Sequence, residues 1–238
     1  MTSYECDLRA IKVSIGIPCG SDVPWQTALS LAKTVQVCAL QGISAELNIV
    51  AGCSIVTRAR SLVLDQFLKG TANRLFWIDA DVVWEPADFF KMLAHSTVMD
   101  VVCGAYPMRG GAHAGQFTIQ HPDLENFELN NYGCVKIEGI GMGFSIMTRE
   151  VVERVAASKP KLRDRAHGTQ LAEVFRVDTV DEDCARGEDM AFFADVRELG
   201  FPVWLDPTIN VGHVGSHVFR ANAAKSLHLE HVYRPEEA

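Results

Sequence analysis

Apolar and polar positions follow two alternating periods over the first half of the chain. Residues 13–18 and 45–50 alternate at the strand period of two, and a turn containing glycine follows each run. Residues 24–40 and 56–68 carry apolar side chains at helical spacing, and Pro24 suits a first helical position. Strands and helices in this order are typical of a parallel sheet covered by helices, so we expect an α/β fold.

The third predicted strand ends in the most informative stretch of the sequence. Large apolar residues at positions 74–78 lead directly into Asp79, Ala80 and Asp81, and Pro86 opens a further predicted helix through residue 94. Both carboxylates lie at the strand exit, and the carboxyl ends of strands line the ligand crevice of an open α/β sheet. Two nearby carboxylates repel each other, and a divalent cation such as Mg²⁺ or Mn²⁺, bridging to phosphate oxygens, is a natural compensator. The plainer alternative is that aspartate only ends the strand and caps the next turn.

The pattern becomes less regular after residue 106 and predicts a smaller mixed or antiparallel lobe. The charged segment 159–186 is only weakly periodic, and we expect a long loop there with one strand at 172–177. The remaining elements expected are strands at 100–106, 116–120, 135–138, 145–147 and 202–205, and helices at 149–157 and 187–199.

Composition and charge exclude several classes of protein. The 238 residues suit one large domain or two small ones, and the 48% hydrophobic content is ordinary for a globular protein. The net charge of −8, without a long basic run, argues against nucleic acid or an anionic membrane as the main partner. Residues 1–9 do not resemble a secretory signal, and no apolar stretch is long enough to cross a bilayer. Seven scattered cysteines without a C-x-x-C pair disfavour a disulfide framework or a thiolate zinc site, and favour a cytoplasmic location.

Three further sets of side chains are candidates for chemistry. Arg58 and Arg60 lie in the first turns of a predicted helix, where cations oppose the helix dipole, so either solvent exposure or an anionic ligand accounts for them. Glu188 and Asp189 open another helix, where acidic residues stabilise the dipole whether or not they take part in catalysis. His213 lies in a glycine-punctuated turn and is either a ligand or an ordinary core or surface histidine.

In their order and spacing, the Asp79-Ala80-Asp81 strand end, the Glu188-Asp189 helix start and His213 resemble the GT-A glycosyltransferases, which use nucleotide-sugar donors. The resemblance covers about residues 13–217. It implies a single GT-A-like α/β domain whose mainly parallel nucleotide-binding sheet is flanked by helices. The implied parts are a nucleotide-sugar-binding half at about 11–106, an acceptor and catalytic half at about 107–217, and a peripheral tail at 218–238.

The resemblance also implies a role for each candidate residue. Asp81 would be the main metal ligand, His213 would complete the Mn²⁺ or Mg²⁺ shell, and Asp79 would bind metal and face the nucleotide. Asp189, with Glu188 in reserve, would take the proton from the acceptor hydroxyl in an inverting transfer. The other implied contacts are Pro18 and Cys19 at the base of the nucleotide, Arg60 and Arg58 behind the diphosphate or base, Ala80 within the motif, and Gly141, Met142 and Gly143 on the acceptor side.

The predicted function is therefore the metal-dependent transfer of one sugar from a UDP- or GDP-type donor to a carbohydrate or other hydroxyl acceptor. In this family an acidic residue soon after the first strand often binds the uracil ring, and Asp22 is the candidate for it here. The chain departs from the family in having Cys19-Gly20-Ser21 before that residue, and it lacks the Gln-x-x-Arg-Trp motif of processive members. Three alternatives stay open: a haloacid-dehalogenase-like phosphatase with Asp79 as nucleophile, a sugar nucleotidyltransferase, and an inactive binding module. The sequence leaves the oligomeric state open.

Overall fold

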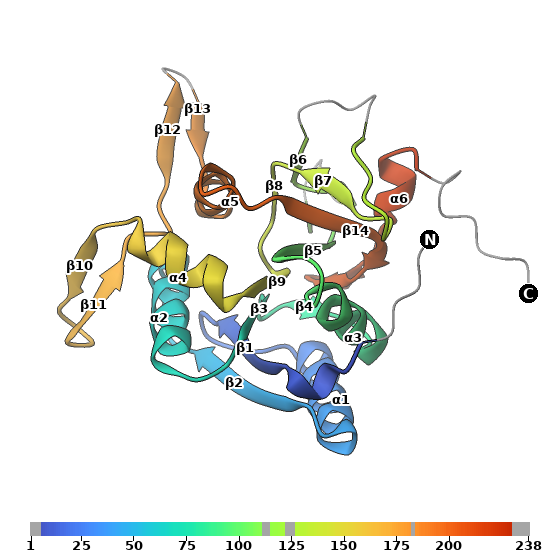
Figure 1. Ribbon diagram of the computed structural model, residues 1–238, viewed down its shortest axis with the longest axis horizontal. Helices are drawn as coiled ribbons and strands as arrows, with labels where there is room; N and C mark the ends of the chain where they lie inside the picture. The colour runs from blue at the N-terminus through green and yellow to red at the C-terminus, as the bar shows by residue number, and fades with distance from the viewer. Residues whose placement is uncertain (1–5, 111–114, 122–126, 182–183, 230–238) are drawn as a thin grey trace, which may run out of the picture.

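Seven strands form one central sheet in the computed structural model, which describes residues 6–110, 115–121, 127–181 and 184–229 (Figure 1). The strands are β1 (Lys12–Pro18), β2 (Ser44–Val50), β3 (Arg74–Ile78), β5 (Val101–Ala105), β7 (Val135–Ile137), β9 (Phe144–Thr148) and β14 (Val203–Asn210). Their order across the sheet is β2-β1-β3-β9-β5-β14-β7. β1 pairs in parallel with β2 and β3, and β5 pairs in parallel with β14. β9 runs antiparallel between β3 and β5, and β7 is antiparallel to β14.

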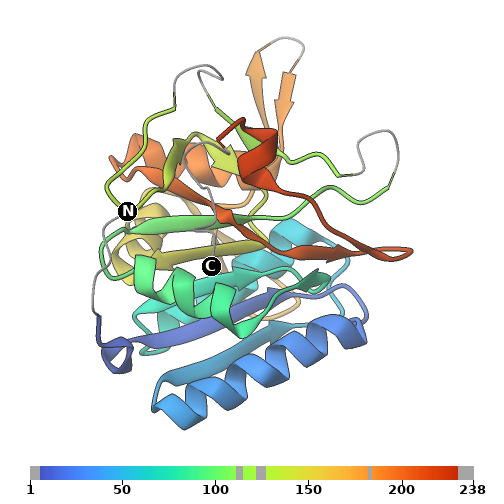
Figure 2. The same cartoon turned by 90° about the vertical axis from the view of Figure 1, so that its right-hand side faces the viewer.

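Helices cover both faces of this sheet (Figure 2). They are α1 (Trp25–Gln41), α2 (Val56–Lys69), α3 (Pro86–His95), α4 (Arg149–Ala157), α5 (Glu188–Glu198) and the short α6 (Ala223–Ser226). α1 and α3 pack on one face, and α2, α4 and α5 pack on the other. β3 alternates accordingly, with Leu75 and Trp77 in the core under α2, α4 and α5, and Phe76 and Ile78 in the opposite core. A strand that is buried on both faces has a continuous run of apolar residues, as β3 has in this sequence.

Most helices and strands of the sheet begin and end within a residue or two of their predicted positions. Gly42 ends α1 in the left-handed conformation, with a φ of 69°, which glycine adopts without a steric penalty. Pro86 occupies the first turn of α3, where its missing N–H costs no hydrogen bond. Among the helices that the structure describes, none is both long and apolar enough to span a membrane.

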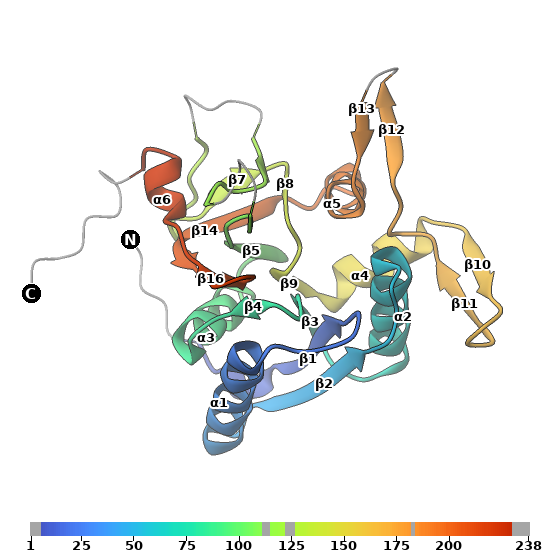
Figure 3. The same cartoon turned by 180° about the vertical axis from the view of Figure 1, so that it is seen from behind.

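The segment 159–186 differs from its prediction. It forms two antiparallel hairpins that project from the body of the protein (Figure 3). The hairpins are β10 (Lys161–Asp164) with β11 (Thr169–Ala172), and β12 (Asp178–Asp181) with β13 (Cys184–Arg186). The strand expected at 172–177 is wrong, because residues 173–177 connect the two hairpins. β10 and β13 expose most of their side chains, so no buried apolar face marks them in the sequence.

Short strands form two further small sheets. β4 (Val82–Val83), β15 (Gly212–Val214) and β16 (Val218–Phe219) form a small sheet, and β6 (Ile119–Gln120) pairs with β8 (Gly139–Ile140). The strand expected at 116–120 is thus limited to two residues, and β14 continues beyond its predicted end at residue 205. At the start of the segment expected to be a peripheral tail, Ala223 and Ala224 are buried against the main core. Residues 230–238 of that segment lie outside the described residues.

Candidate functional site

Three parallel strands of the central sheet end at one edge, and a cavity of about 580 Å³ opens there. Pro18 is the last residue of β1, Asp79 directly follows β3, and Tyr106 directly follows β5. The first turns of α2 and α5 supply the other walls. The cavity is lined by Pro18, Gly20, Ser21, Asp22, Pro24, Val56, Arg60, Asp79, Ala80, Asp81, Tyr106, Arg109, Glu188, Asp189 and His213.

Backbone hydrogen bonds hold Asp79 and Asp81 at the exit of β3. The chain leaves the strand at Asp79 and turns through Ala80 and Asp81 before β4 begins. The Asp79 N–H donates to the carbonyl of Gly143 at 3.0 Å, and the Val214 N–H donates to the carbonyl of Asp81 at 2.7 Å. Two segments from the second half of the chain therefore fix the Asp-x-Asp turn.

His213 and Arg109 both contact the carboxylate of Asp81. His213 Nε2 lies 3.3 Å from Asp81 Oδ1, and the guanidinium of Arg109 pairs with Oδ2. His213 Nδ1 lies 2.8 Å from the Pro107 carbonyl, so Nδ1 carries a hydrogen and Nε2 faces the aspartate. Burial alone would lower the pKa of His213, but its hydrogen bonds to Asp81 and Pro107 raise that pKa above the ordinary value. Burial would likewise raise the pKa of Asp81, but the hydrogen bond from His213 and the nearby positive charges lower it.

Arg60 is the centre of a second group of charges. Its side chain is 3% exposed, and Nη2 lies 3.1 Å from Asp79 Oδ1 and 3.2 Å from Asp189 Oδ1. Its Nε lies 3.9 Å from Glu188 Oε1. Burial opposes the charged form, but the surrounding carboxylates raise the pKa of Arg60, so the guanidinium stays charged. Nε and Nη1 have no hydrogen-bond acceptor among the described residues, which leaves them for a polar ligand or water.

Asp189 is a largely buried carboxylate with a raised pKa. Its pKa is raised to about 6, mainly by burial, while Arg60 opposes the shift and the charges of Asp79 and Glu188 add to it. The Met142 N–H donates to Asp189 Oδ2 at 3.2 Å and fixes that side of the carboxylate. A carboxylate with a pKa near 6 that opens into a cavity is suited to accept a proton at neutral pH.

The segment 141–143 contacts Asp79 and Asp189. None of its residues, Gly141, Met142 and Gly143, is among the described residues that line the cavity. A Cβ atom on Gly143 would overlap the carboxylate of Asp79, so only glycine leaves room for that side chain. The Tyr106 hydroxyl donates to Asp79 Oδ2 at 3.3 Å and accepts from the Gly143 N–H at 3.1 Å. The glycine segment and the tyrosine together set the position of Asp79.

Negative charge exceeds positive charge around the cavity. The guanidinium groups of Arg60 and Arg109 face four carboxylates, which belong to Asp79, Asp81, Glu188 and Asp189. Asp22 also lines the cavity, and a divalent cation would offset most of this excess. Asp81 and His213 fit such a cation, since an oxygen and a nitrogen already face each other and a carbonyl orients the imidazole. Asp79 fits it less directly, because Asp79, Asp81 and His213 do not place all their ligand atoms within 4.8 Å of one another.

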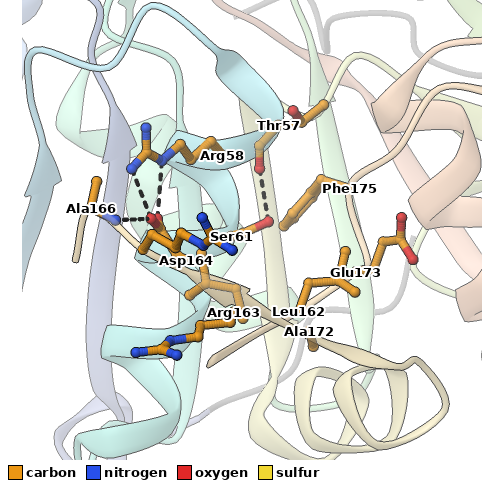
Figure 4. A pocket seen from close by; sticks show the side chains of 12 residues that line it. Thr57, Arg58, Ser61, Leu162, Arg163, Asp164, Ala166, Ala172, Glu173 and Phe175 are labelled. Carbon is orange, nitrogen blue, oxygen red and sulfur yellow. Dashed lines mark hydrogen bonds and ion pairs between the residues drawn. The ribbon is translucent and has the colours of Figure 1, made fainter. Parts of the chain in front are cut away.

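The structure does not bring Arg58 into this cavity. Arg58 pairs with Asp164 of β10, with Nε and Nη2 donating at 3.0 and 2.8 Å (Figure 4). The pair belongs to a second cavity of about 520 Å³ between α2 and the first hairpin. Residues i and i+2 of a helix do not share a face, which separates Arg58 from Arg60. Cys19 does not line the first cavity either, and its side chain is buried.

Two residues of the cavity were not predicted to take part in its chemistry. Tyr106 follows β5 as Asp79 follows β3, so its place at the end of a parallel strand was the available signal. Arg109 lies between the strands expected at 100–106 and 116–120, and its contact with Asp81 depends on β15, whose Val214 carbonyl accepts a hydrogen bond from Arg109 Nη1 at 2.7 Å. Sequence spacing alone does not reveal such a contact.

Comparison with known proteins finds solved structures with a similar fold but no matching sequence family. No family model matches the chain, and neither does any curated protein. Among solved structures, A197 from STIV matches with a TM-score of 0.57 and 20% identity over 89% of this chain and 95% of that one. GalNAc-T7, crystallised with UDP, GalNAc and Mn²⁺, matches with a TM-score of 0.54 and 10% identity over 86% of this chain and 44% of that one.

A third match is the catalytic domain of Drosophila beta1,4-galactosyltransferase 7 in complex with xylobiose. It gives a TM-score of 0.49 and 13% identity over 96% of this chain and 76% of that one. Because the sequence identities are low, the similarity to A197 and to GalNAc-T7 shows only the fold of this chain. The protein has a GT-A-like α/β fold, with a mainly parallel sheet flanked by helices, as its sequence predicted.

Proposed function

We propose that this protein is a metal-dependent glycosyltransferase that moves one sugar from a nucleotide-diphosphate sugar to a hydroxyl acceptor. The observation that carries the proposal is the excess of carboxylates at the carboxyl edge of β1, β3 and β5, where Asp81 meets His213. The GT-A-like fold supports it, because GalNAc-T7 has this fold and was crystallised with UDP and Mn²⁺.

Asp81 and His213 are the residues that would hold Mn²⁺ or Mg²⁺, with Asp79 facing the nucleotide. Carboxylate oxygens suit these hard cations, and an imidazole is an acceptable further ligand. When bound, the cation would act as a Lewis acid that neutralises charge on the departing diphosphate. Arg109 would bind phosphate oxygens when Asp81 turns to the metal, since its guanidinium already lies at this edge of the cavity.

The nucleotide would lie along the end of β1. Pro18, Gly20, Ser21 and Asp22 line that end of the cavity, and the side-chain position of Gly20 is open to solvent. Asp22 would accept hydrogen bonds from N–H groups of the base. The unpaired Nε and Nη1 of Arg60 would donate to the diphosphate or the sugar.

Asp189 would take the proton from the acceptor hydroxyl. Its pKa of about 6 leaves it ionised at neutral pH, and Arg60 and the Met142 N–H hold its two oxygens in place. Glu188 lies in the same helical turn and is the reserve base. A base on the acceptor side corresponds to an inverting transfer.

A thermal-shift panel of nucleoside diphosphates and their sugars, with and without Mn²⁺, tests this proposal. We expect one diphosphate to raise the Tm further when Mn²⁺ is present. Asp81→Asn should lose this difference, whereas Glu150→Gln, an exposed acid on α4, should keep it. Absence of a nucleotide-dependent shift for every common base would contradict the proposal.

Product analysis separates the alternatives. Release of nucleoside diphosphate that depends on an acceptor supports the transferase. Hydrolysis of an aryl phosphate that Asp79→Asn abolishes would instead indicate the phosphatase, and formation of nucleotide sugar with pyrophosphate would indicate the nucleotidyltransferase. Carbohydrate affinity without Mn²⁺ binding or turnover would indicate an inactive binding module. No lysine lies among the described residues that line the cavity, and the phosphatase family needs one.

A further inference from the structure

A second group of ligand-type side chains lies in the core on the α1 and α3 face of the sheet. His95 ends α3, Cys134 directly precedes β7, and Asp206 lies within β14. Their exposures are 4%, 0% and 3%, and their ligand atoms all lie within 4.8 Å of one another. Among the described residues no other group of three or more histidines, cysteines and acids meets this criterion. We propose that these three residues bind a zinc ion and tie α3 to the edge of the sheet.

The distances between the three side chains fit zinc after small shifts. Cys134 Sγ lies 4.0 Å from His95 Nε2, and His95 Nε2 lies 2.9 Å from Asp206 Oδ2. Tetrahedral zinc with ordinary bond lengths separates a sulfur and a nitrogen by about 3.5 Å, and a nitrogen and an oxygen by about 3.4 Å. Movements of about half an ångström bring these two pairs to zinc distances, and the third pair, Cys134 Sγ and the Asp206 carboxylate, lies within 4.8 Å.

The backbone around Cys134 already holds it in place. β7 pairs with β14 antiparallel, with Val135 opposite Leu205, so the next pair in this register is Cys134 opposite Asp206. The Cys134 N–H donates to Asn130 Oδ1 at 2.9 Å, and the Cys134 carbonyl accepts from the Asn130 N–H at 3.0 Å. A ligand that is fixed before the metal arrives loses little entropy on binding.

Charge and proton balance also favour zinc. A thiolate, a carboxylate and a neutral imidazole bring the net charge of a Zn²⁺ site to zero, which suits a buried place. On binding, the Cys134 thiol gives its proton to solvent, and the His95 imidazole carries its hydrogen on Nδ1. Lys91, whose Nζ now lies 2.7 Å from Asp206 Oδ2, is half exposed, and its ammonium can turn to water. Asp206 Oδ1 stays hydrogen-bonded to Thr208, whose N–H and hydroxyl donate to it at 2.9 and 2.6 Å.

Sequence spacing gave no sign of this site. It contains one cysteine, and its ligands come from a helix, a loop and a strand that are far apart in the chain, so the scattered cysteines disfavoured a thiolate zinc site. The site is separate from the cavity at the ends of β1, β3 and β5, called the acidic cavity below, and shares no residue with it.

Metal analysis of the purified protein tests the proposal. We expect about one zinc per chain, and after chelation Co²⁺ should give a thiolate-to-cobalt absorption band. Cys134→Ser should lose the band, whereas Cys38→Ser, which removes another buried thiol, and Asp81→Asn, which alters the acidic cavity, should keep it. Zinc added back to the chelated Asp81→Asn protein, whose acidic cavity has lost the main ligand proposed for its cation, should raise its Tm. That measurement remains decisive if Cys134→Ser does not fold. A zinc-free protein with no cobalt–thiolate band and no zinc-dependent Tm would overturn the proposal, whatever the outcome at the acidic cavity.

Discussion

Arg60 is the residue on which the acidic cavity most depends. One buried guanidinium lies within 4.0 Å of carboxylates from α5 and from Asp79, which directly follows β3. In the sequence Arg60 lies in a helical turn where a cation opposes the dipole, and either solvent exposure or an anionic ligand accounted for it. The structure supplies an anionic partner from the protein itself and still leaves two of its nitrogens without an acceptor among the described residues.

Replacing Arg60 by methionine should destabilise the protein strongly. Asp79 and Asp189 would lose their shared counter-charge, and breaking a buried ion pair from one side costs about 3–5 kcal/mol. The loss in free energy of unfolding should shrink from pH 7 to pH 5, because protonation of the orphaned carboxylates removes their repulsion. Urea denaturation measures it. Arg58→Met, on the same helix but in the other cavity, is the matched control and should cost much less; equal losses would contradict this account.

Asp189 makes the rate of the proposed transfer depend on pH. Its pKa is raised, so the basic form is lost as the pH falls through about 6, and kcat/KM should rise between pH 5 and pH 7. Asp189→Asn should lower kcat by about a hundredfold to ten-thousandfold and leave the Kd for nucleoside diphosphate nearly unchanged. Glu188→Gln should keep the pH profile. The assignment of the base fails if Glu188→Gln removes the pH dependence and Asp189→Asn does not.

At the scale of elements, sequence periodicity predicted those that bury a face. α4 begins and ends at its predicted residues, because Val151, Val152 and Val155 form one apolar stripe. The hairpins β10–β11 and β12–β13 were missed, because charged and exposed strands have no such stripe. β14 was predicted too short, because its register shifts between Asp206 and Asn210 and a proline lies within it.

The same reasoning explains which parts of the site could be predicted. An apolar strand that ends in Asp79 and Asp81 is a local pattern, and the strand-end rule places it at a crevice. Arg58 and Arg60 look alike in the sequence, and only packing decides which of them faces the cavity. Tyr106 and Arg109 enter the site through contacts with β15 and the Gly143 backbone, which local patterns do not encode.

The first hairpin should loosen when its contact with α2 is removed. Asp164 accepts both Arg58 hydrogen bonds and also the Ala166 N–H at 2.9 Å, so Asp164→Asn weakens the attachment and the turn together. Hydrogen exchange measured by mass spectrometry should become faster over residues 161–172 and stay unchanged over α3. Glu173→Gln, which alters another acid of the same cavity, should have little effect. Unchanged exchange in Asp164→Asn would show that the pair does not hold the hairpin.

At the scale of the whole molecule, the two predicted halves share one sheet and build one cavity. Asp79, Asp81 and Arg60 come from the first half, whereas Glu188, Asp189 and His213 come from the second. The antiparallel strand β9 lies between β3 and β5, and Gly143 directly before it contacts Asp79. The site therefore takes residues from both halves of the chain, and neither half contains it alone.

Calorimetric titration of Mn²⁺, with and without the nucleoside diphosphate that the thermal-shift panel selects, tests the central claim most directly. If Asp81 and His213 hold a cation that also binds the diphosphate, each ligand must raise the affinity for the other by the same factor, about tenfold or more. Asp81→Asn should abolish this coupling and Glu150→Gln should retain it. Mn²⁺ affinity that neither the diphosphate nor Asp81→Asn changes would contradict the account.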